Sequence, residues 1–266
     1  MRFELHCHST CSDGSEPPDR VAARAHERNV EVFALTDHDT CAGSAVTVPG
    51  ARVVRGVEIT CDDQGATVHV LAFDRGGQWT LLEERLAGVR TARTNRLKVM
   101  AARLEQRGIH IDISPLLAVA AQRAVGRPDL ARAMVAAGAA SSLKDAFTRH
   151  LYDGGPVDVP HSSLSIGDAL EVGRAAGAAM SLAHPHLYDQ RTPSLAKRFK
   201  PLGLTAIEAY YGPYDQRERA RWIELADAHG MVCTGGSDWH GPEQAIAQPG
   251  VDLPPDRSDA LLRWLE

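Results

Sequence analysis

The chain of 266 residues carries 29 Lys and Arg against 34 Asp and Glu, which gives a formal charge of −5, and 44% of its residues are hydrophobic. A net acidic chain lacks the broad basic surface that duplex DNA requires, and no apolar run approaches the roughly 20 residues of a membrane span. The length suits one α/β barrel or two modest domains. Because the N-terminus leads into a polar motif instead of a signal-peptide core, we expect a cytoplasmic protein.

The N-terminal extended run ends in His6-Cys7-His8, followed by the polar turn Ser12-Asp13-Gly14. Side chains alternate along a strand, so His6 and His8 point to one face and can chelate one ion, and Asp13 could reach the same ion or a neighbouring one. For an isolated His-x-His, a partly buried strand with satisfied imidazoles is the commoner explanation, so further ligands must decide. The five cysteines are an odd number without Cys-x-x-Cys spacing, which favours reduced thiols, with Cys11 as an alternative ligand.

An alternation of helices and strands follows, broken by one long helical stretch. The predicted elements are a helix over 21–28, strands over 30–36, 53–60 and 66–73, a helical stretch over 79–158, a helix over 165–176, strands over 178–183 and 205–211, a helix over 214–229, a strand over 231–236 and a helix over 257–265. Short helices between barrel strands do not need 80 residues of chain. We therefore predict a helical insertion at 79–158 in a barrel formed by 1–78 and 159–266.

Gly126-Arg127-Pro128 stands at the head of one helix of this insertion. An arginine beside free backbone N–H groups suits a phosphate, and a surface arginine at a turn is the alternative.

Nine ionisable residues stand at or just beyond the predicted carboxyl ends of parallel strands. They are His6, His8, Asp13, His38, Glu58, His69, His184, Asp238 and His240. The active sites of α/β barrels lie at this face, so residues far apart in sequence converge there. Such a cluster would leave groups unsatisfied without cations. Nine donors exceed the needs of one ion, so we expect two or three divalent ions, with Mn first and Fe or Zn as alternatives.

A carboxylate such as Glu58 can bridge two ions about 3.5–4 Å apart, the spacing of sites that cleave phosphate esters. The nucleophile is then a metal-activated hydroxide, and we expect Glu58, Asp238 and His240 to act in catalysis through it. The sequence has no Gly-x-Ser-x-Gly elbow and no Walker-type loop.

These motifs resemble one known family. They are His6-x-His8, Ser12-Asp13-Gly14, Thr36-Asp37-His38-Asp39, Gly56-Val57-Glu58, His69, His184-Pro185 and Ser237-Asp238-x-His240, and their order is similar to that of the polymerase and histidinol phosphatase (PHP) superfamily. The resemblance implies a distorted (β/α)7 TIM-like barrel with a trinuclear metal centre. It assigns three ligand groups: His6, His8, Glu58 and Asp238; Glu58, His69 and His184; and Asp13, His38 and His240.

Within the superfamily, the insertion motifs Gly126-Arg127-Pro128 and Asp145 to Pro160 resemble the branch of nucleotide phosphatases and 5′-to-3′ exoribonucleases. That branch usually reads His-Pro-Gly-Arg-Tyr where this chain reads His184-Pro185-His186-Leu187-Tyr188. The arginine that would recognise a second phosphate is therefore absent, and His186 or Arg191 could take its place.

We therefore expect a metal-dependent phosphoesterase with Arg127 and His186 as substrate contacts. Its predicted substrate is a 5′-mononucleotide, a 3′,5′-bisphosphate or a short 5′-phosphorylated RNA, with no duplex DNA or membrane as partner; the sequence leaves the oligomeric state open. The alternatives are a phosphatase of histidinol phosphate or another small phosphomonoester, and a non-catalytic metal-binding module.

Overall fold

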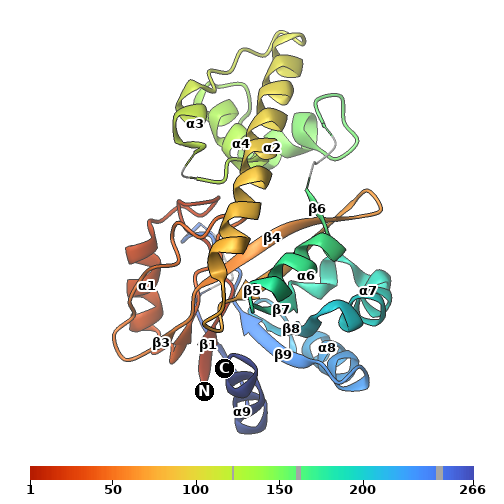
Figure 1. Ribbon diagram of the computed structural model, residues 1–266. Coiled ribbons are helices and arrows are strands. Elements are labelled where there is room, and N and C mark those ends of the chain that lie inside the picture. Colours follow the sequence, from red (N-terminus) through yellow and green to blue (C-terminus); the bar gives the residue numbers. More distant parts are fainter. Residues whose placement is uncertain (122, 160–162, 244–247) are drawn as a thin grey trace.

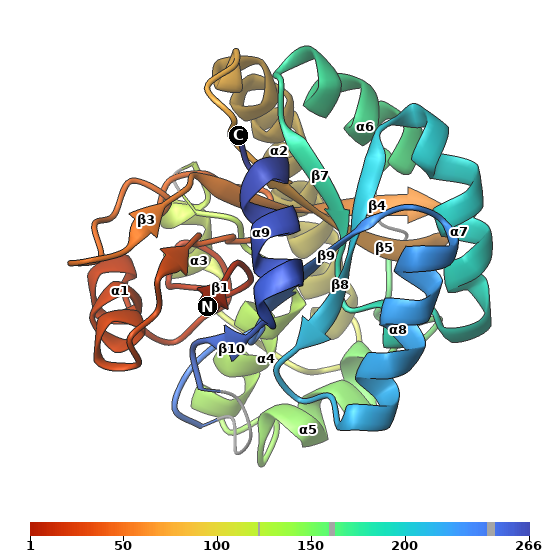
Figure 2. The same ribbon diagram turned by 90° about the horizontal axis from the view of Figure 1, so that it is seen from below.

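The computed structural model describes residues 1–121, 123–159, 163–243 and 248–266, so Pro160 of the second insertion motif lies outside the described residues. Across these residues the strands form two sheets surrounded by helices (Figure 1; Figure 2). The larger sheet has the order β6 (Leu164–Ser165), β4 (Gly56–Asp63), β5 (Ala66–Phe73), β7 (Ala179–Leu182), β8 (Leu204–Tyr211) and β9 (Val232–Gly236). The smaller has the order β10 (Val251–Asp252), β1 (Arg2–Glu4), β2 (Val32–Phe33) and β3 (Arg52–Val53). The predicted mixed α/β class is confirmed.

The two sheets meet at two places, where the chain segments that follow β1 and β2 make backbone hydrogen bonds with the larger sheet. On one side, Leu5 N donates to Gly235 O at 3.2 Å, so the chain after β1 runs beside β9. On the other, Glu58 N donates to Thr36 O at 3.1 Å, so the chain after β2 runs beside β4. These bonds arrange the strand ends around one space, while the strand pairing itself remains that of two sheets.

The expectation that Glu58 and His69 end parallel strands is wrong. β4 and β5 are antiparallel over their whole length, with Glu58 opposite Leu71 and Thr60 opposite His69. The two residues that connect these strands, Gln64 and Gly65, have φ values of 58° and 86°. That left-handed geometry belongs to the tightest hairpin turns, which join antiparallel strands. Glu58 therefore lies near the start of β4 and His69 in the middle of β5.

Helices cover the outside of the sheets (Figure 2). They are α1 (Pro18–Glu27), α6 (Ile166–Ala175), α7 (Thr192–Phe199), α8 (Gln216–Ala228) and α9 (Pro255–Trp264), with short 3₁₀ turns at Pro185–Leu187, Asp189–Arg191 and Lys200–Leu202. Ser165 and Asp215 cap α6 and α8 by accepting hydrogen bonds from backbone N–H groups of the first turn, which fixes where these helices begin. Trp222 of α8 and Leu261 of α9 are buried in the main core.

A helical segment projects from this body (Figure 1). It contains α2 (Trp79–Glu105), α3 (Ser114–Val119), α4 (Arg127–Ala136), α5 (Leu143–Ala146) and a π-helical turn, η1 (Phe147–Leu151). The first half of α2 packs in the main core through Leu82 and Leu86, whereas Leu97 and Met100 from its second half pack in a separate core with α4. The helix α2 thus joins two separate hydrophobic cores. Within the described residues, no helix combines the length and the apolar character that a membrane crossing requires.

Candidate metal centre

Nine His, Asp and Glu side chains converge from the segments that follow β1, β2, β7 and β9 and from the β4–β5 hairpin. Among the described residues they make four overlapping groups, and within each group the candidate ligand atoms lie within 4.8 Å of one another. The groups together contain His6, His8, Asp13, His38, Glu58, His69, His184, Asp238 and His240. The structure thus brings together every residue predicted as a metal ligand, and we call these nine residues the metal-ligand cluster.

Glu58 lies in the middle of the metal-ligand cluster, and its two oxygens face different imidazoles. Its Oε2 is 3.3 Å from Nε2 of His6 and 3.2 Å from Nε2 of His8. Its Oε1 is 2.9 Å from Nδ1 of His69 and 3.0 Å from Nε2 of His184. One carboxylate in this position can bridge two ions.

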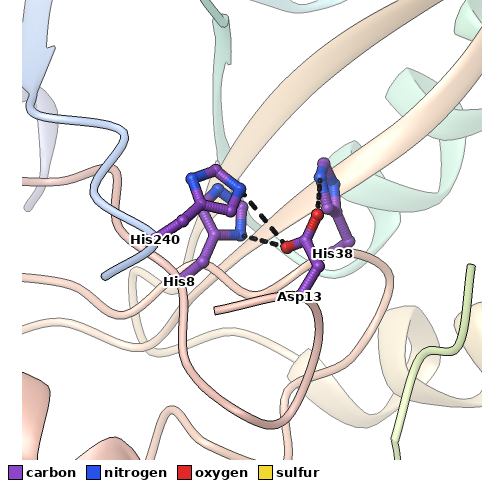
Figure 3. Close-up of side chains that lie close together, drawn as sticks. All are labelled: His8, Asp13, His38 and His240. Atoms are coloured by element: carbon purple, nitrogen blue, oxygen red, sulfur yellow. Dashed lines mark ion pairs between the residues drawn. The ribbon is translucent and has the colours of Figure 1, made fainter. Parts of the chain in front are cut away.

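Two aspartates complete the metal-ligand cluster on either side of His8. Asp238 Oδ1 lies 3.2 Å from Nε2 of His8 and 3.4 Å from Nε2 of His6. Asp13 Oδ1 lies 3.3 Å from Nε2 of His240 and 3.7 Å from Nδ1 of His8, and Asp13 Oδ2 lies 3.7 Å from Nε2 of His38 (Figure 3). The two imidazole nitrogens of His8 thus face different carboxylates.

The central atoms of the metal-ligand cluster are buried without hydrogen bonds. Among the described residues, His6 Nε2, His8 Nε2, His38 Nδ1 and Glu58 Oε2 have no hydrogen-bond partner. Leaving such atoms unsatisfied is costly, and cations bound within the cluster would satisfy them. Nitrogen and oxygen ligands lie about 2.0–2.2 Å from a metal ion and so about 3–3.5 Å from one another, which agrees with the separations around Glu58. The residues present therefore fit divalent metal ions.

Comparison with known proteins places this arrangement in a family. The PHP domain model matches residues 4–114. The chain is 31% identical to the 3′,5′-nucleoside bisphosphate phosphatase of Chromobacterium violaceum over 264 residues, covering 95% of this chain and 93% of that protein. The chain belongs to the PHP family.

Another relative of this PHP protein is a 5′-3′ exoribonuclease of Haemophilus influenzae, 33% identical over 252 residues, which are 91% of this chain and 90% of the relative. Among solved structures, a metal-dependent phosphoesterase from Bifidobacterium adolescentis superposes with a TM-score of 0.85 at 28% identity, covering 98% of this chain and 96% of that one. Sequence and fold therefore agree on the family.

Buried side chains outside the metal-ligand cluster orient its imidazoles, and the sequence interpretation missed them. Glu208, on β8, lies 3.0 and 3.1 Å from Nδ1 of His6 through its two oxygens and accepts a hydrogen bond from His184 N at 2.7 Å. With Nδ1 of His6 occupied in this way, Nε2 is left facing Glu58. Such carboxylate–imidazole pairs set the tautomer and basicity of a metal ligand. A carboxylate inside an otherwise apolar strand was the available signal, because a buried charge requires a partner.

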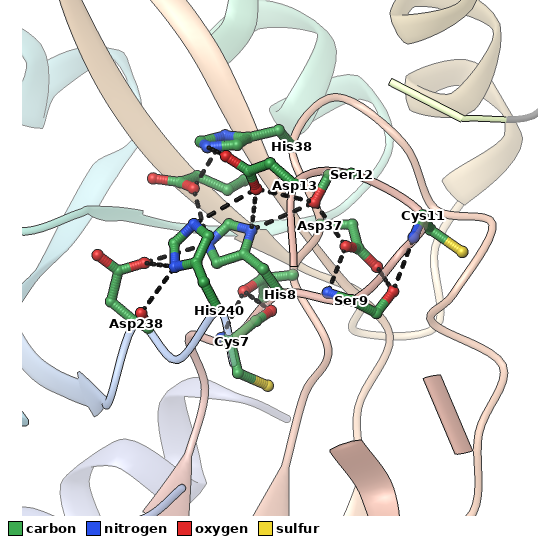
Figure 4. A network of polar contacts seen from close by, with 12 residues as sticks. Cys7, His8, Ser9, Cys11, Ser12, Asp13, Asp37, His38, Asp238 and His240 are labelled. Carbon is green, nitrogen blue, oxygen red and sulfur yellow. Dashed lines mark hydrogen bonds and ion pairs between the residues drawn. The ribbon is translucent and has the colours of Figure 1, made fainter. Parts of the chain in front are cut away.

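Two other carboxylates hold the backbone that carries the ligands. Glu4 is buried and accepts hydrogen bonds from His6 N, Ser237 N and Oγ, and Gly250 N, which ties the end of β1 to the end of β9. Burial raises the pKa of Glu4 to about 7 even though these donors lower it. Asp37 accepts hydrogen bonds from Ser9 N and Oγ, each at 2.7 Å, and from Ser12 Oγ at 2.6 Å (Figure 4).

Burial and neighbouring charges shift the pKa values of the carboxylates and imidazoles in the metal-ligand cluster. Burial raises the pKa of Glu58, but the surrounding imidazoles, His38 foremost, hold the pKa of Glu58 well below its ordinary value. Burial lowers the pKa of His8, but contact with Asp238 and Glu58 raises this pKa to about 10. A metal ligand must be a neutral imidazole, so ions that bind to His8 compete with protons for this ring.

A cavity of about 180 Å³ opens beside the metal-ligand cluster, between the cluster and the helical segment. Its walls include Asp13, His38 and His69 on one side and three arginines, Arg93, Arg96 and Arg127, on the other. The residues that add apolar surface are Leu97, Met100, Val125 and Phe147. An anion in this cavity would lie between the ions and the arginines.

The residues predicted to contact substrate lie in different places. Arg127 lines the cavity at the start of α4. His186 is not among the described residues that line it; its ring lies 5.1 Å from that of Tyr211, and its Nδ1 is 2.8 Å from the hydroxyl of Tyr214. Arg191 donates to Asp63 Oδ2 at 2.8 Å, so this guanidinium is already occupied at the end of β4.

Proposed function

We propose that this PHP protein is a metal-dependent phosphoesterase that hydrolyses phosphate from nucleotides. The observation that carries the proposal is the metal-ligand cluster, with unsatisfied central atoms, opening onto a cavity walled by arginines. The names of the relatives, a nucleoside bisphosphate phosphatase and an exoribonuclease, support a nucleotide as substrate. The candidates are a 5′-mononucleotide, a 3′,5′-bisphosphate and a short 5′-phosphorylated RNA.

The chemistry follows from the donor set. Divalent ions held by the metal-ligand cluster would lower the pKa of water toward neutrality and offset charge on the phosphate oxygens. Glu58 would keep two ions together through its two oxygens. Asp238 and His240, on the chain after β9, would hold ions on either side of His8. The proposed catalytic role of Glu58, Asp238 and His240 is therefore to position the ions.

Arg127 is the arginine best placed to exchange its present partner for a phosphate. It is paired with Asp153, whose side chain is 83% exposed, so the pair contributes little and opens easily. Arg93 is paired with Asp39, which is fully buried and would be left as an unpaired charge if Arg93 turned away. We therefore assign phosphate contact to Arg127 and treat the Arg93–Asp39 pair as part of the cavity wall. His186, half-buried beside Tyr211 and Tyr214, would contact the part of the substrate that extends away from Arg127.

We also propose details of the fold, the metal centre and the location of the protein. The strand ends would close a distorted (β/α)7 barrel from residues 1–78 and 159–266, with residues 79–158 as a helical insertion that caps the metal-ligand cluster. The metal centre would hold two or three ions, with Mn ahead of Fe and Zn. The protein would act in the cytoplasm, on small phosphorylated molecules and not on duplex DNA.

Phosphate release in the presence of Mn²⁺ tests the function. The substrates are a nucleoside 5′-phosphate, a nucleoside 3′,5′-bisphosphate, a short 5′-phosphorylated RNA, histidinol phosphate and simple sugar phosphates at equal concentration. We expect the highest kcat/KM on one of the nucleotides. A preference for histidinol phosphate would reject the nucleotide assignment, and no turnover on any substrate would favour a non-catalytic metal-binding module.

A further inference from the structure

The helical segment forms hydrogen bonds with the backbone of the loop that carries Asp13. Four consecutive carbonyl oxygens of this loop accept hydrogen bonds from residues 123–132. Arg123 Nε donates to Thr10 O at 2.6 Å, Ala124 N donates to Cys11 O at 3.1 Å, Arg123 Nη2 donates to Ser12 O, and Arg132 Nη2 donates to Asp13 O. The loop therefore has a second layer of support on the side away from β1.

Asp129 joins the two arginines to each other and to the start of α4. Its carboxylate, only 3% exposed, accepts hydrogen bonds from Arg123 Nη2, from Arg132 Nη1 at 3.4 Å and from Gly126 N at 2.8 Å. The buried Asp129 carboxylate thus has two charged partners, and it holds both guanidiniums in the orientation that reaches the loop. We call Arg123, Asp129 and Arg132 the loop clamp.

The opposite side of the loop is fixed as well. Asp37 accepts hydrogen bonds from Ser9 and Ser12 there (Figure 4). Between these two supports, the Asp13 carboxylate faces His240, His38 and His8, and its side chain is 14% exposed (Figure 3). Because two sets of hydrogen bonds hold this loop, the Asp13 carboxylate loses little conformational entropy when it coordinates an ion.

We propose that Arg123, Asp129 and Arg132 are positioning residues that hold Asp13 for the ion shared by Asp13, His38 and His240. The loop clamp makes the affinity for this ion depend on the docked position of α4. Since α4 begins at Arg127, which lines the cavity, one helix carries Asp129 and Arg132 of the clamp together with the arginine assigned to the phosphate, and Arg123 lies just before this helix. This inference rests on the metal centre of the proposed function, and not on any particular substrate.

Calorimetric titration of the metal-stripped full chain with Mn²⁺ tests the loop clamp without an activity assay. Arg132→Ala is the first variant, because its side chain is 39% exposed and its truncation leaves the core intact. We expect about 10-fold weaker affinity for one bound Mn²⁺, the lower end of what loss of an outer-shell partner costs, with the other binding events unchanged. Arg132→Lys keeps the charge but not the planar fork and should recover part of the affinity. Arg149→Ala removes an arginine paired with Asp145 on the same segment and should bind Mn²⁺ like the wild type.

The background variant Asp13→Asn separates positioning from a general loss of structure. If Arg132 acts through Asp13, adding Arg132→Ala to Asp13→Asn changes no Mn²⁺ affinity any further. Equal Mn²⁺ binding by Arg132→Ala and wild type, or a uniform loss at every site together with a lower melting temperature, would overturn the loop clamp. Wild-type protein that binds Mn²⁺ but releases phosphate from none of the substrates would instead overturn the proposed function and leave the clamp standing.

Discussion

The metal-ligand cluster faces three arginines, Arg93, Arg96 and Arg127, across one cavity, and we call these arginines the arginine wall. The two regions differ in how their charges are satisfied. In the cluster, central ring and carboxylate atoms have no hydrogen-bond partner among the described residues. On the wall, Arg93, Arg96 and Arg127 each have a carboxylate partner: Asp39, Asp158 and Asp153, respectively. The buried atoms of the cluster thus need cations as partners, whereas every arginine of the wall already has a carboxylate partner. An anion that binds Arg127 must displace Asp153.

The largest expected effect comes from Glu58→Gln, which removes the charge at the centre of the metal-ligand cluster. We expect bound metal to fall, and kcat/KM to fall by more than the roughly 10–100-fold that loss of an outer-shell partner costs, because both oxygens of Glu58 face imidazoles. Elemental analysis of the purified protein and phosphate release measure the two quantities. Glu171→Gln, at an exposed position on α6, is the matched control. Activity that survives Glu58→Gln would reject the bridging role.

Glu208→Gln tests whether the cluster depends on the side chains behind it. The amide keeps the shape but cannot accept hydrogen bonds at both of its ends, so the contacts to His6 and His184 conflict. We expect metal affinity to fall by about 10-fold, measured by calorimetry with Mn²⁺. Unchanged affinity would mean that packing alone sets the orientation of His6.

On the arginine wall, Arg127→Ala should mainly raise KM. A hydrogen bond to a charged group contributes about 1.5–3 kcal/mol, so we expect KM to rise about 10-fold or more while metal content stays at the wild-type value. Arg149→Ala is the control for loss of an arginine from the same segment. A KM equal to that of the wild type would make Arg127 a surface arginine with no contact to substrate.

The smallest effect is expected at Asp63, outside both regions. Although burial raises it, hydrogen bonds from Arg198 and Arg191 lower the pKa of Asp63. A lowered folded-state pKa contributes stability above the unfolded pKa of about 3.9 and loses it as the pH falls through the folded value. Asp63→Asn should therefore lower the free energy of unfolding at pH 7 by on the order of 1 kcal/mol, since both guanidiniums are more than 40% exposed.

Denaturant titrations of Asp63→Asn and wild type at pH 7 and near pH 3 measure this difference. It should shrink toward zero at the lower pH, and a difference that grows there would contradict the assigned sign.

The residues of the metal-ligand cluster could be predicted from the sequence because most of them lie in short polar motifs next to an apolar run, whereas Glu58 and His69 are isolated ionisable residues within such runs. The strand arrangement could be predicted only in part. The hairpin turn at Gln64-Gly65 is weakly marked in the sequence, because Asn-Gly, Asp-Gly or Gly-Gly is the usual pair in such a turn, so the sequence favours a uniformly parallel sheet. Glu58 and His69 still reach the cluster, since Glu58 is opposite Leu71 and His69 is the diagonal neighbour on the same face.

The outer layer was harder to predict, because its contacts join residues far apart in the chain. Glu208 lies 202 positions from His6, and Arg132 lies 119 positions from Asp13. No local pattern specifies such a pair. A glutamate within an apolar strand shows that a partner is needed, but only the fold shows which partner it is.

The most direct test is phosphate release from a nucleoside 3′,5′-bisphosphate as Mn²⁺ is added to metal-stripped protein. We expect no release before addition and a rise that levels off only after more than one Mn²⁺ per chain has bound. Full activity in the stripped protein, or no activity on any nucleotide at saturating Mn²⁺, would contradict this expectation.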